Sequence, residues 1–220
     1  MLKLKVTIKI PLPYIFFWMV LLFFSAESQA QKNLSRTYIS EGIENIGIDG
    51  NGVHTLKILA MPVEEISVNV YLEGETSEEI VIKEQLKSNQ LILGFGSWPL
   101  AKTYNDKLSA HKIVSVTVVV SVPERLFVSV TSNSTAVFAE GTFAFLSIDI
   151  EDKACVVTNF NGDAQLQTNQ GAIEVFVQNN STRAVAKTTY GTLQNMLNTT
   201  GIYTIYAEST HGDITLQQTQ

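Results

Sequence analysis

The amino-acid sequence predicts an all-β fold, and more narrowly a right-handed single-stranded parallel β-helix, which is one kind of β-solenoid. Apolar and polar residues alternate with period two wherever the chain after residue 36 is patterned, as in strands with one buried side. Glycines recur at intervals near 20 residues in the second half, as in a stack of similar turns. An antiparallel β-sandwich is the alternative, because it also gives short strands separated by glycine turns.

Residues 1–30 have the three parts of a secretory signal peptide. Lysines precede an uncharged apolar run at 11–24, and the small residues Ser28 and Ala30 occupy the −3 and −1 positions before Gln31. The run of about 14 residues is shorter than the roughly 20 that cross a bilayer, so we expect cleavage rather than a permanent anchor. The expected location is exported: the periplasm, the outer membrane surface or the extracellular space.

The charge balance argues against a polyanionic partner. Removing residues 1–30 leaves 12 of the 15 basic and 20 of the 21 acidic residues, a net charge of −8. Nucleic acid and anionic lipid need clustered cations, which this sequence lacks. The single cysteine, Cys155, cannot form an intramolecular disulfide, and its apolar neighbours predict a buried, unreactive thiol.

We expect residues 31–220 to form one domain. Residues 37–130 are rich in strand patterns without a visible period, and residues 131–220 carry the regular repeats. Within the first part, Asp49-Gly50-Asn51-Gly52 is typical of a hairpin turn. Two short apolar runs at 80–82 and 91–93 predict a hairpin, and the β-branched run at 113–122 predicts a strand.

The repeat is marked by glycines followed by a small or acidic residue and then alternating apolar residues. Glycine allows a positive φ where a chain bends, and Asp or Asn beside it tolerates the same conformation. Each turn of a solenoid buries its apolar side only by stacking on its neighbours. The residues that define the repeat are Gly141, Gly162, Asp163, Gly171, Gly191, Gly212 and Asp213.

The order of features resembles a known family. The stretch 105–112 (NDKLSAHK), a valine-rich strand, Val122-Pro123-Glu124 and Gly-Asp-Ile-like repeats follow one another. This order is similar to that of the exported bacterial "putative adhesin", or β-strand-repeat, domains, over roughly residues 40–220. The resemblance implies a parallel β-helix, a location in a Gram-negative envelope and an adhesive or scaffolding role.

The sequence predicts no catalytic residue, no cofactor and no metal site. His54, His111 and His211 lie far apart in the sequence and have no partner at ligand spacing. The strongest candidates for chemistry are Asp149 and Glu151, two residues apart on one predicted strand, with Asp163 one motif later. Carboxylates lined up on neighbouring turns of a β-helix would suit polysaccharide hydrolysis. A solvated face and a turn explain them more simply.

Two functions therefore follow from the sequence. The first is a non-enzymatic envelope or surface protein that binds an envelope or surface glycan or protein. The second is a polysaccharide-active enzyme or glycan-binding module on the same fold. The final strand pattern, near Leu216, predicts an exposed solenoid edge at the C-terminal end, where self-association could occur. We expect no transmembrane segment in the mature chain.

Overall fold

The computed structural model describes residues 32–73, 80–97 and 115–219. The chain divides into two units, residues 1–31 and residues 32–220, and the described residues all belong to the second. The predicted cleavage site at Ala30 and Gln31 and residues 98–114, which include His111, lie outside the described residues. Cleavage therefore stays a prediction.

The described part of the chain is all-β, as predicted, and its fifteen strands form one large mixed sheet. The strands are β1 (Lys32–Ile39), β2 (Asn45–Asp49), β3 (Thr55–Met61), β4 (Glu65–Glu73), β5 (Ile80–Lys87), β6 (Gln90–Ser97), β7 (Ser115–Pro123), β8 (Phe127–Ser132), β9 (Ala136–Ile150), β10 (Cys155–Thr168), β11 (Ile173–Val177), β12 (Thr182–Thr188), β13 (Leu193–Asn195), β14 (Tyr203–Ser209) and β15 (Ile214–Gln218).

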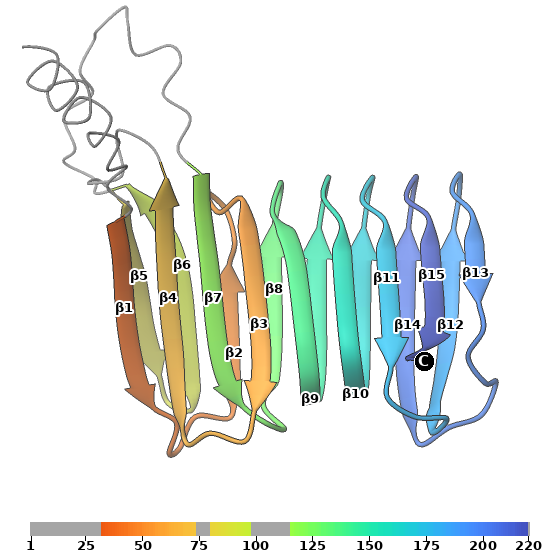
Figure 1. Ribbon diagram of the computed structural model, residues 1–220, viewed down its shortest axis with the longest axis horizontal. Helices are drawn as coiled ribbons and strands as arrows, with labels where there is room; N and C mark the ends of the chain where they lie inside the picture. Colours follow the sequence, from red (N-terminus) through yellow and green to blue (C-terminus); the bar gives the residue numbers. More distant parts are fainter. Residues whose placement is uncertain (1–31, 74–79, 98–114, 220) are drawn as a thin grey trace, which may run out of the picture. The chain divides into compact units, whose positions relative to one another are not determined.

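Two long strands, β9 and β10, divide this sheet into two faces because each pairs with different neighbours in its two halves. Face 1 has the order β1-β4-β7-β3-β9-β10-β11-β15-β13 and includes the first halves of β9 and β10. Face 2 has the order β5-β6-β2-β8-β9-β10-β14-β12 and includes their second halves. Figure 1 shows the strands of both faces following one another along the long direction of the view. The sheet is open, since each face ends in a strand with one free edge.

Most strand pairs are parallel. Eleven of the fourteen pairings are parallel, and the three antiparallel ones (β1 with β4, β4 with β7, β5 with β6) lie toward one end. An antiparallel sandwich does not have this pattern. Val137, Cys155 and Ile173 are register partners, so the repeat in this region is 18 residues, slightly below the predicted value.

The core is a single cluster built from alternate residues of both faces. In β7 the inward residues Val116, Val118, Val120 and Val122 are at most 3% exposed, as the period-two pattern predicts. Their branched side chains fit a pleated, half-buried surface. Cys155 is fully buried in the same cluster, as predicted.

One predicted hairpin is confirmed and one is wrong. Strands β5 and β6 pair antiparallel across a short turn. The turn at residues 49–52 is instead a corner, because β2 pairs with β6 and β8 while β3 pairs with β7 and β9. A turn signal in the sequence predicts where the chain changes direction, but not which strand the next strand pairs with. After residues 49–52 the chain passes from β2 on face 2 to β3 on face 1.

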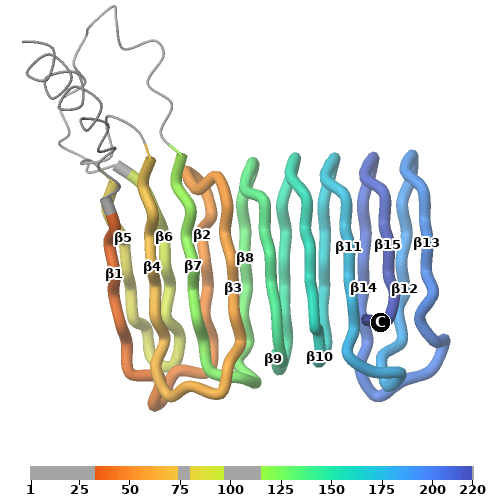
Figure 2. Tube along the Cα trace, in the orientation of Figure 1, coloured from red at the N-terminus to blue at the C-terminus, as the bar shows by residue number. Residues whose placement is uncertain are grey.

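The order of the last strands departs from the order of the sequence. We call β14 and β15 the inserted pair, and β12 and β13 the end pair. The inserted pair lies between the earlier strands β10 and β11 and the end pair (Figures 1 and 2). Strand β14 contacts β10 and β12, and β15 contacts β11 and β13. The predicted open edge after Leu216 is therefore wrong: the edge belongs to the end pair, because β15 has a neighbour on both sides.

Candidate functional site

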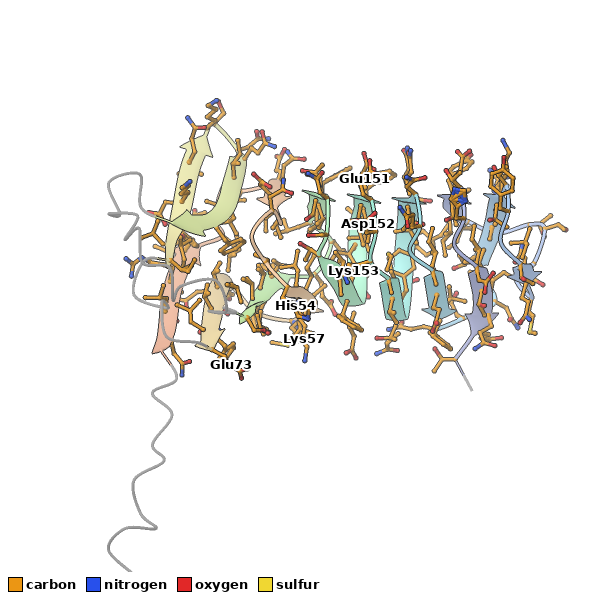
Figure 3. The ribbon with its side chains drawn as sticks, turned by 90° about the horizontal axis from the view of Figure 1, so that it is seen from above. His54, Lys57, Glu73, Glu151, Asp152 and Lys153 are labelled. Atoms are coloured by element: carbon orange, nitrogen blue, oxygen red, sulfur yellow. The ribbon has the colours of Figure 1, made fainter. Side chains whose placement is uncertain are left out.

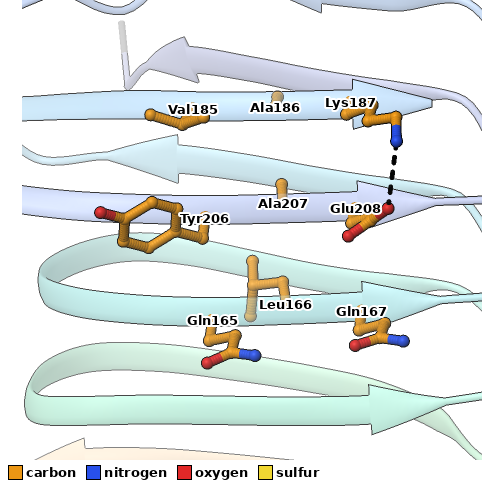
Figure 4. Close-up of a pocket in the computed structure, with 9 residues that line it drawn as sticks. All are labelled: Gln165, Leu166, Gln167, Val185, Ala186, Lys187, Tyr206, Ala207 and Glu208. Atoms are coloured by element: carbon orange, nitrogen blue, oxygen red, sulfur yellow. Dashed lines mark ion pairs between the residues drawn. The ribbon is translucent and has the colours of Figure 1, made fainter.

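The outward side of face 2 carries a shallow groove over β10, β14 and β12. Strand β14 pairs with β10 on one side and with β12 on the other, and each of these strands contributes two outward residues with a small or apolar residue between them. Figure 4 shows these side chains. Gln165 is in register with Tyr206, which is in register with Val185. The groove has a volume of about 220 Å³. Its outward residues are Gln165, Gln167, Val185, Lys187, Tyr206 and Glu208.

The alternation of these strands explains the groove. Leu166 and Ala207 point into the core and are at most 3% exposed, so the residues on either side of them must point outward. Tyr206 is 51% exposed and Val185 is 54% exposed. The groove therefore presents an aromatic ring and an aliphatic side chain to solvent, beside amide and charged groups.

The charged side of the groove is one ion pair. Lys187 Nζ lies 3.8 Å from Glu208 Oε1, and the two side chains are 75% and 63% exposed. Ion pairs this exposed contribute little to stability. Both groups are consequently available to a ligand without loss of the fold.

A second aromatic feature lies on the same face, farther along the strands. Phe127 and Phe145 are neighbours in register, and their rings stack with centroids 6.4 Å apart. The same row continues through Asp163 and Thr204 to Arg183, whose Nε donates a hydrogen bond to Thr204 Oγ1 at 2.9 Å. The outward side of face 2 thus carries aromatic, amide and hydroxyl groups over several neighbouring strands.

The three candidate carboxylates are only partly brought together. Asp149 and Glu151 line one small polar hollow, but Glu151 lies in the turn after β9, and Figure 3 shows it followed by Asp152 and Lys153. The partner of Asp149 on β10 is Gln167, four residues beyond Asp163. At about 3.3 Å per residue, Asp163 is about 13 Å away along the strand. This arrangement does not place all three acids in one groove.

Asp163 and Asp213 instead hold the backbone of neighbouring strands. Asp163 Oδ1 accepts a hydrogen bond from Thr204 N at 2.7 Å, and Asp213 Oδ1 accepts one from Thr192 N at 2.6 Å. Both contacts join the inserted pair to strands distant in sequence.

The repeat glycines occupy two different corners. Gly141 and Gly162 have positive φ values of 110° and 138°, at the bends within β9 and β10. Gly171, Gly212 and Gly191 stack on one another at the other corner without positive φ. A Cβ on Gly212 would lie 2.0 Å from the carbonyl oxygen of Gly171, so close approach, rather than φ, requires glycine there.

A row of hydroxyls at this second corner was missed in the sequence. Thr168 Oγ1 donates to the carbonyl oxygen of Gly171 at 2.6 Å and lies 2.9 Å from Ser209 Oγ. Ser209 Oγ accepts from Gly212 N at 2.9 Å, and Thr188 Oγ1 donates to the carbonyl oxygen of Gly212 at 2.9 Å. The signal is the spacing Ser/Thr-x-x-Gly, which occurs at 168–171, 188–191 and 209–212.

The remaining candidates for chemistry lie apart in the described structure. His54 lies just before β3, whereas His211 lies after β14 and stacks on Tyr190 with ring centroids 4.9 Å apart. Residues 32–73, 80–97 and 115–219 contain no group of three or more metal-ligating side chains. Burial raises the pKa of the Cys155 thiol to about 12, so this thiol does not supply a nucleophile at neutral pH.

Larger hollows than the face 2 groove exist but fit a ligand less well. One of about 550 Å³ beside Phe176 and Gln217 adjoins residue 220, which lies outside the described residues. Another of about 440 Å³ near Met61 and Val63 is lined by the turn after β3 and by residues of β3, β4 and β7, without an aromatic or amide side chain. The first also combines an aromatic ring with amide groups, but it adjoins a residue outside the described ranges, whereas every residue that lines the face 2 groove is described. The face 2 groove is therefore the better-defined candidate.

Within the described ranges, no helix has the length and apolar character needed to cross a bilayer. No family model matches the chain, and no curated protein matches it. Similarity is found among solved structures. A putative cell adhesion protein from Clostridium sporogenes has 13% identity and a TM-score of 0.65, over 86% of this chain and 100% of that one. At this identity the likeness shows the fold alone.

A second solved structure is described as a putative adhesin from Bacteroides fragilis. It has 12% identity and a TM-score of 0.33, over 87% of this chain and 99% of that one. A third, described as a putative adhesin from Parabacteroides merdae, has 9% identity and a TM-score of 0.29, over 86% and 97%.

Proposed function

We propose that this chain is an exported, non-enzymatic binding protein of the cell envelope or surface, with an adhesive role, built as a right-handed parallel β-helix. The parallel registers and the 18-residue spacing support the helical winding. The strong preference of parallel crossovers for right-handed connections supports its hand. The predicted signal peptide supports export, and the likeness in fold to a protein described as a putative cell adhesion protein supports the role.

The groove on face 2 is the proposed binding surface, and a glycan is the proposed ligand. The observation that carries this proposal is Tyr206, half exposed between Gln165 and Val185 in a shallow groove. An amphipathic, rigid aromatic ring provides contact area at low entropic cost and can stack on the C–H face of a sugar. The neighbouring amides and the Lys187–Glu208 pair can exchange hydrogen bonds with sugar hydroxyls.

The size of the groove favours a chain-like ligand. Pockets that enclose small molecules have volumes of roughly 300–1,000 Å³. A groove of about 220 Å³ on an open sheet is too small to enclose such a ligand. It suits one unit of an oligosaccharide that extends along face 2.

A glycan array probed with the purified protein tests this proposal. We expect binding to a subset of oligosaccharides, and a loss of at least tenfold in affinity for Tyr206→Ala. The matched control is Tyr71→Ala, because Tyr71 is also exposed on a strand but belongs to face 1. No binding to any glycan, or equal losses for both variants, would contradict the proposed ligand.

A further inference from the structure

The position of the inserted pair suggests an interaction with a second copy of the chain. Along face 2, Ala164 is in register with Ile205, which is in register with Ala184. Along face 1, Ile173 is in register with Ile214, which is in register with Leu193. The chain thus passes from β11 to the end pair, leaves a space one strand wide on each face, and fills it afterwards with β14 on face 2 and β15 on face 1.

We propose that this space is an exchangeable site, and that its second occupant is the inserted pair of another copy, giving a strand-swapped dimer. The proposal does not depend on the proposed glycan ligand. Exchange of an identical element between copies needs no new interface, because every contact within the chain has an equivalent between chains.

Burial explains why the space is always filled. Ile205, Ile214 and Leu216 of the inserted pair are fully buried, whereas Leu193 of the end pair is 44% exposed. The residues of β12 that point the same way as Ile205 are Thr182, Ala184, Ala186 and Thr188, none of which is a large aliphatic residue. The inserted pair thus supplies large, fully buried aliphatic side chains, whereas the inward residues of β12 are small and Leu193 of β13 stays partly exposed. This holds whichever copy supplies the inserted pair.

The specific polar contacts also transfer unchanged. The hydrogen bond from Thr204 N to Asp163 Oδ1 and the contact between Thr168 and Ser209 join the inserted pair to β10. The hydrogen bond from Thr192 N to Asp213 Oδ1 joins it to the turn before β13. None of these contacts depends on the connection between β13 and β14, so a donated pair makes all of them.

Only the connection at residues 196–202 differs between the two arrangements. Met196 and Ile202 are 68% and 77% exposed, and of the apolar side chains in this segment Leu197 packs against the core. The hydrogen bonds between this segment and the start of β12 are local: Ile202 N donates to Ser181 O at 2.8 Å, Asn198 Nδ2 donates to Asn180 O at 2.9 Å, and Asn198 forms an isolated parallel bridge with Arg183. This segment is the hinge of the proposed exchange.

Cross-linking between singly substituted chains tests the exchange. Glu174 and Thr215 are register partners on the outward side of face 1, away from the groove. Glu174→Cys and Thr215→Cys chains are unfolded, mixed, refolded at high concentration and treated with a short bifunctional thiol reagent. We expect a cross-linked heterodimer, because a donated β15 brings the two cysteines together. Cys155 is fully buried and does not react in the folded protein.

The control pair is Glu174→Cys with Gln165→Cys, which lie on opposite faces. A yield of heterodimer no higher than in this control would overturn the proposal.

Two hinge variants give an independent measurement. Deletion of Thr199 and Thr200 shortens the hinge and hinders the return of β14 to its own chain. Gly201→Ala acts differently, because its Cβ would lie 2.5 Å from the carbonyl oxygen of Ser181. For both we expect at least a tenfold rise in the dimer-to-monomer ratio in size-exclusion chromatography with light scattering, with strand content checked by circular dichroism. Monomers in both cases would contradict the exchange.

Discussion

At the scale of single residues, the stacked glycines set the distance between neighbouring strands at one corner. A Cβ on Gly212 would lie 2.0 Å from Gly171 O and cannot be accommodated without moving backbone. We expect Gly212→Ala to lower the free energy of unfolding by at least about 2 kcal/mol. Gly94→Ala is the control, since its nearest neighbours would lie 3.9 Å away. Urea unfolding measures both, and similar losses would contradict the role of close approach.

The buried thiol makes a second prediction at this scale. Burial raises the pKa of Cys155 from 9.0 to about 12, so between these values the unfolded chain loses its proton and the folded one keeps it. The contribution of this group to stability is complete below pH 9 and decreases as the pH rises toward 12. We expect the free energy of unfolding of the native chain to fall more steeply between pH 9 and 11 than that of Cys155→Ala. Parallel slopes would show that the thiol ionises in the folded protein.

At the scale of elements, the hydroxyl row joins the ends of β10, β14 and β12 to the corners that follow them. Thr168→Val removes the donor to Gly171 O and leaves a buried carbonyl without that bond. We expect a loss of about 1–3 kcal/mol in the free energy of unfolding. Thr215→Val, on the outward side of β15, should change it by less than about 0.5 kcal/mol. Thermal unfolding of the two variants compares them, and equal midpoints would remove the hydroxyl row as a stabilising feature.

The elements also show how far the sequence determines the fold. The β-branched, alternating run at 113–122 correctly predicted β7, and the two short apolar runs at 80–82 and 91–93 correctly predicted the β5–β6 hairpin, because these signals are local. Strand partners are not local, which explains why residues 49–52 were wrongly assigned to a hairpin. The inserted order was not predictable either: β12 and β14 both end in Ser/Thr-x-x-Gly corners, so either could pair with β10.

The same reasoning applies to the candidate site. Asp149, Glu151 and Asp163 were selected by residue type, but their separation depends on which strands are in register. The groove around Tyr206 is formed by strands that are distant in sequence. Tyr206 on β14 is in register with Val185 on β12, which lies 21 residues earlier, and with Gln165 on β10, which lies 41 residues earlier. No local pattern brings these strands together, so the groove could not be predicted without the strand order.

At the scale of the whole described unit, the two ends of the stack differ. Toward β1 and β5 the sheet ends in antiparallel strands. At the other end the inward residues of the end pair are partly open, and the hinge residue Leu197 packs against the core. In a stack held by contacts between neighbours, stability is lowest at an open end, so local opening should begin at β12 and β13.

Amide hydrogen exchange tests this gradient. We expect the slowest exchange in β9 and β10, which have neighbours on both sides, and the fastest in β12 and β13. Leu197→Ala removes part of the apolar cover at the open end, and a loss of about 1 kcal/mol there corresponds to about fivefold faster exchange in the end pair. Exchange in β9 and β10 should stay unchanged, because opening at the end does not expose them. Leu86→Ala is the control, since Leu86 is 64% exposed and lies on β5. Uniform acceleration by Leu197→Ala in all strands would mean that the unit opens only as a whole.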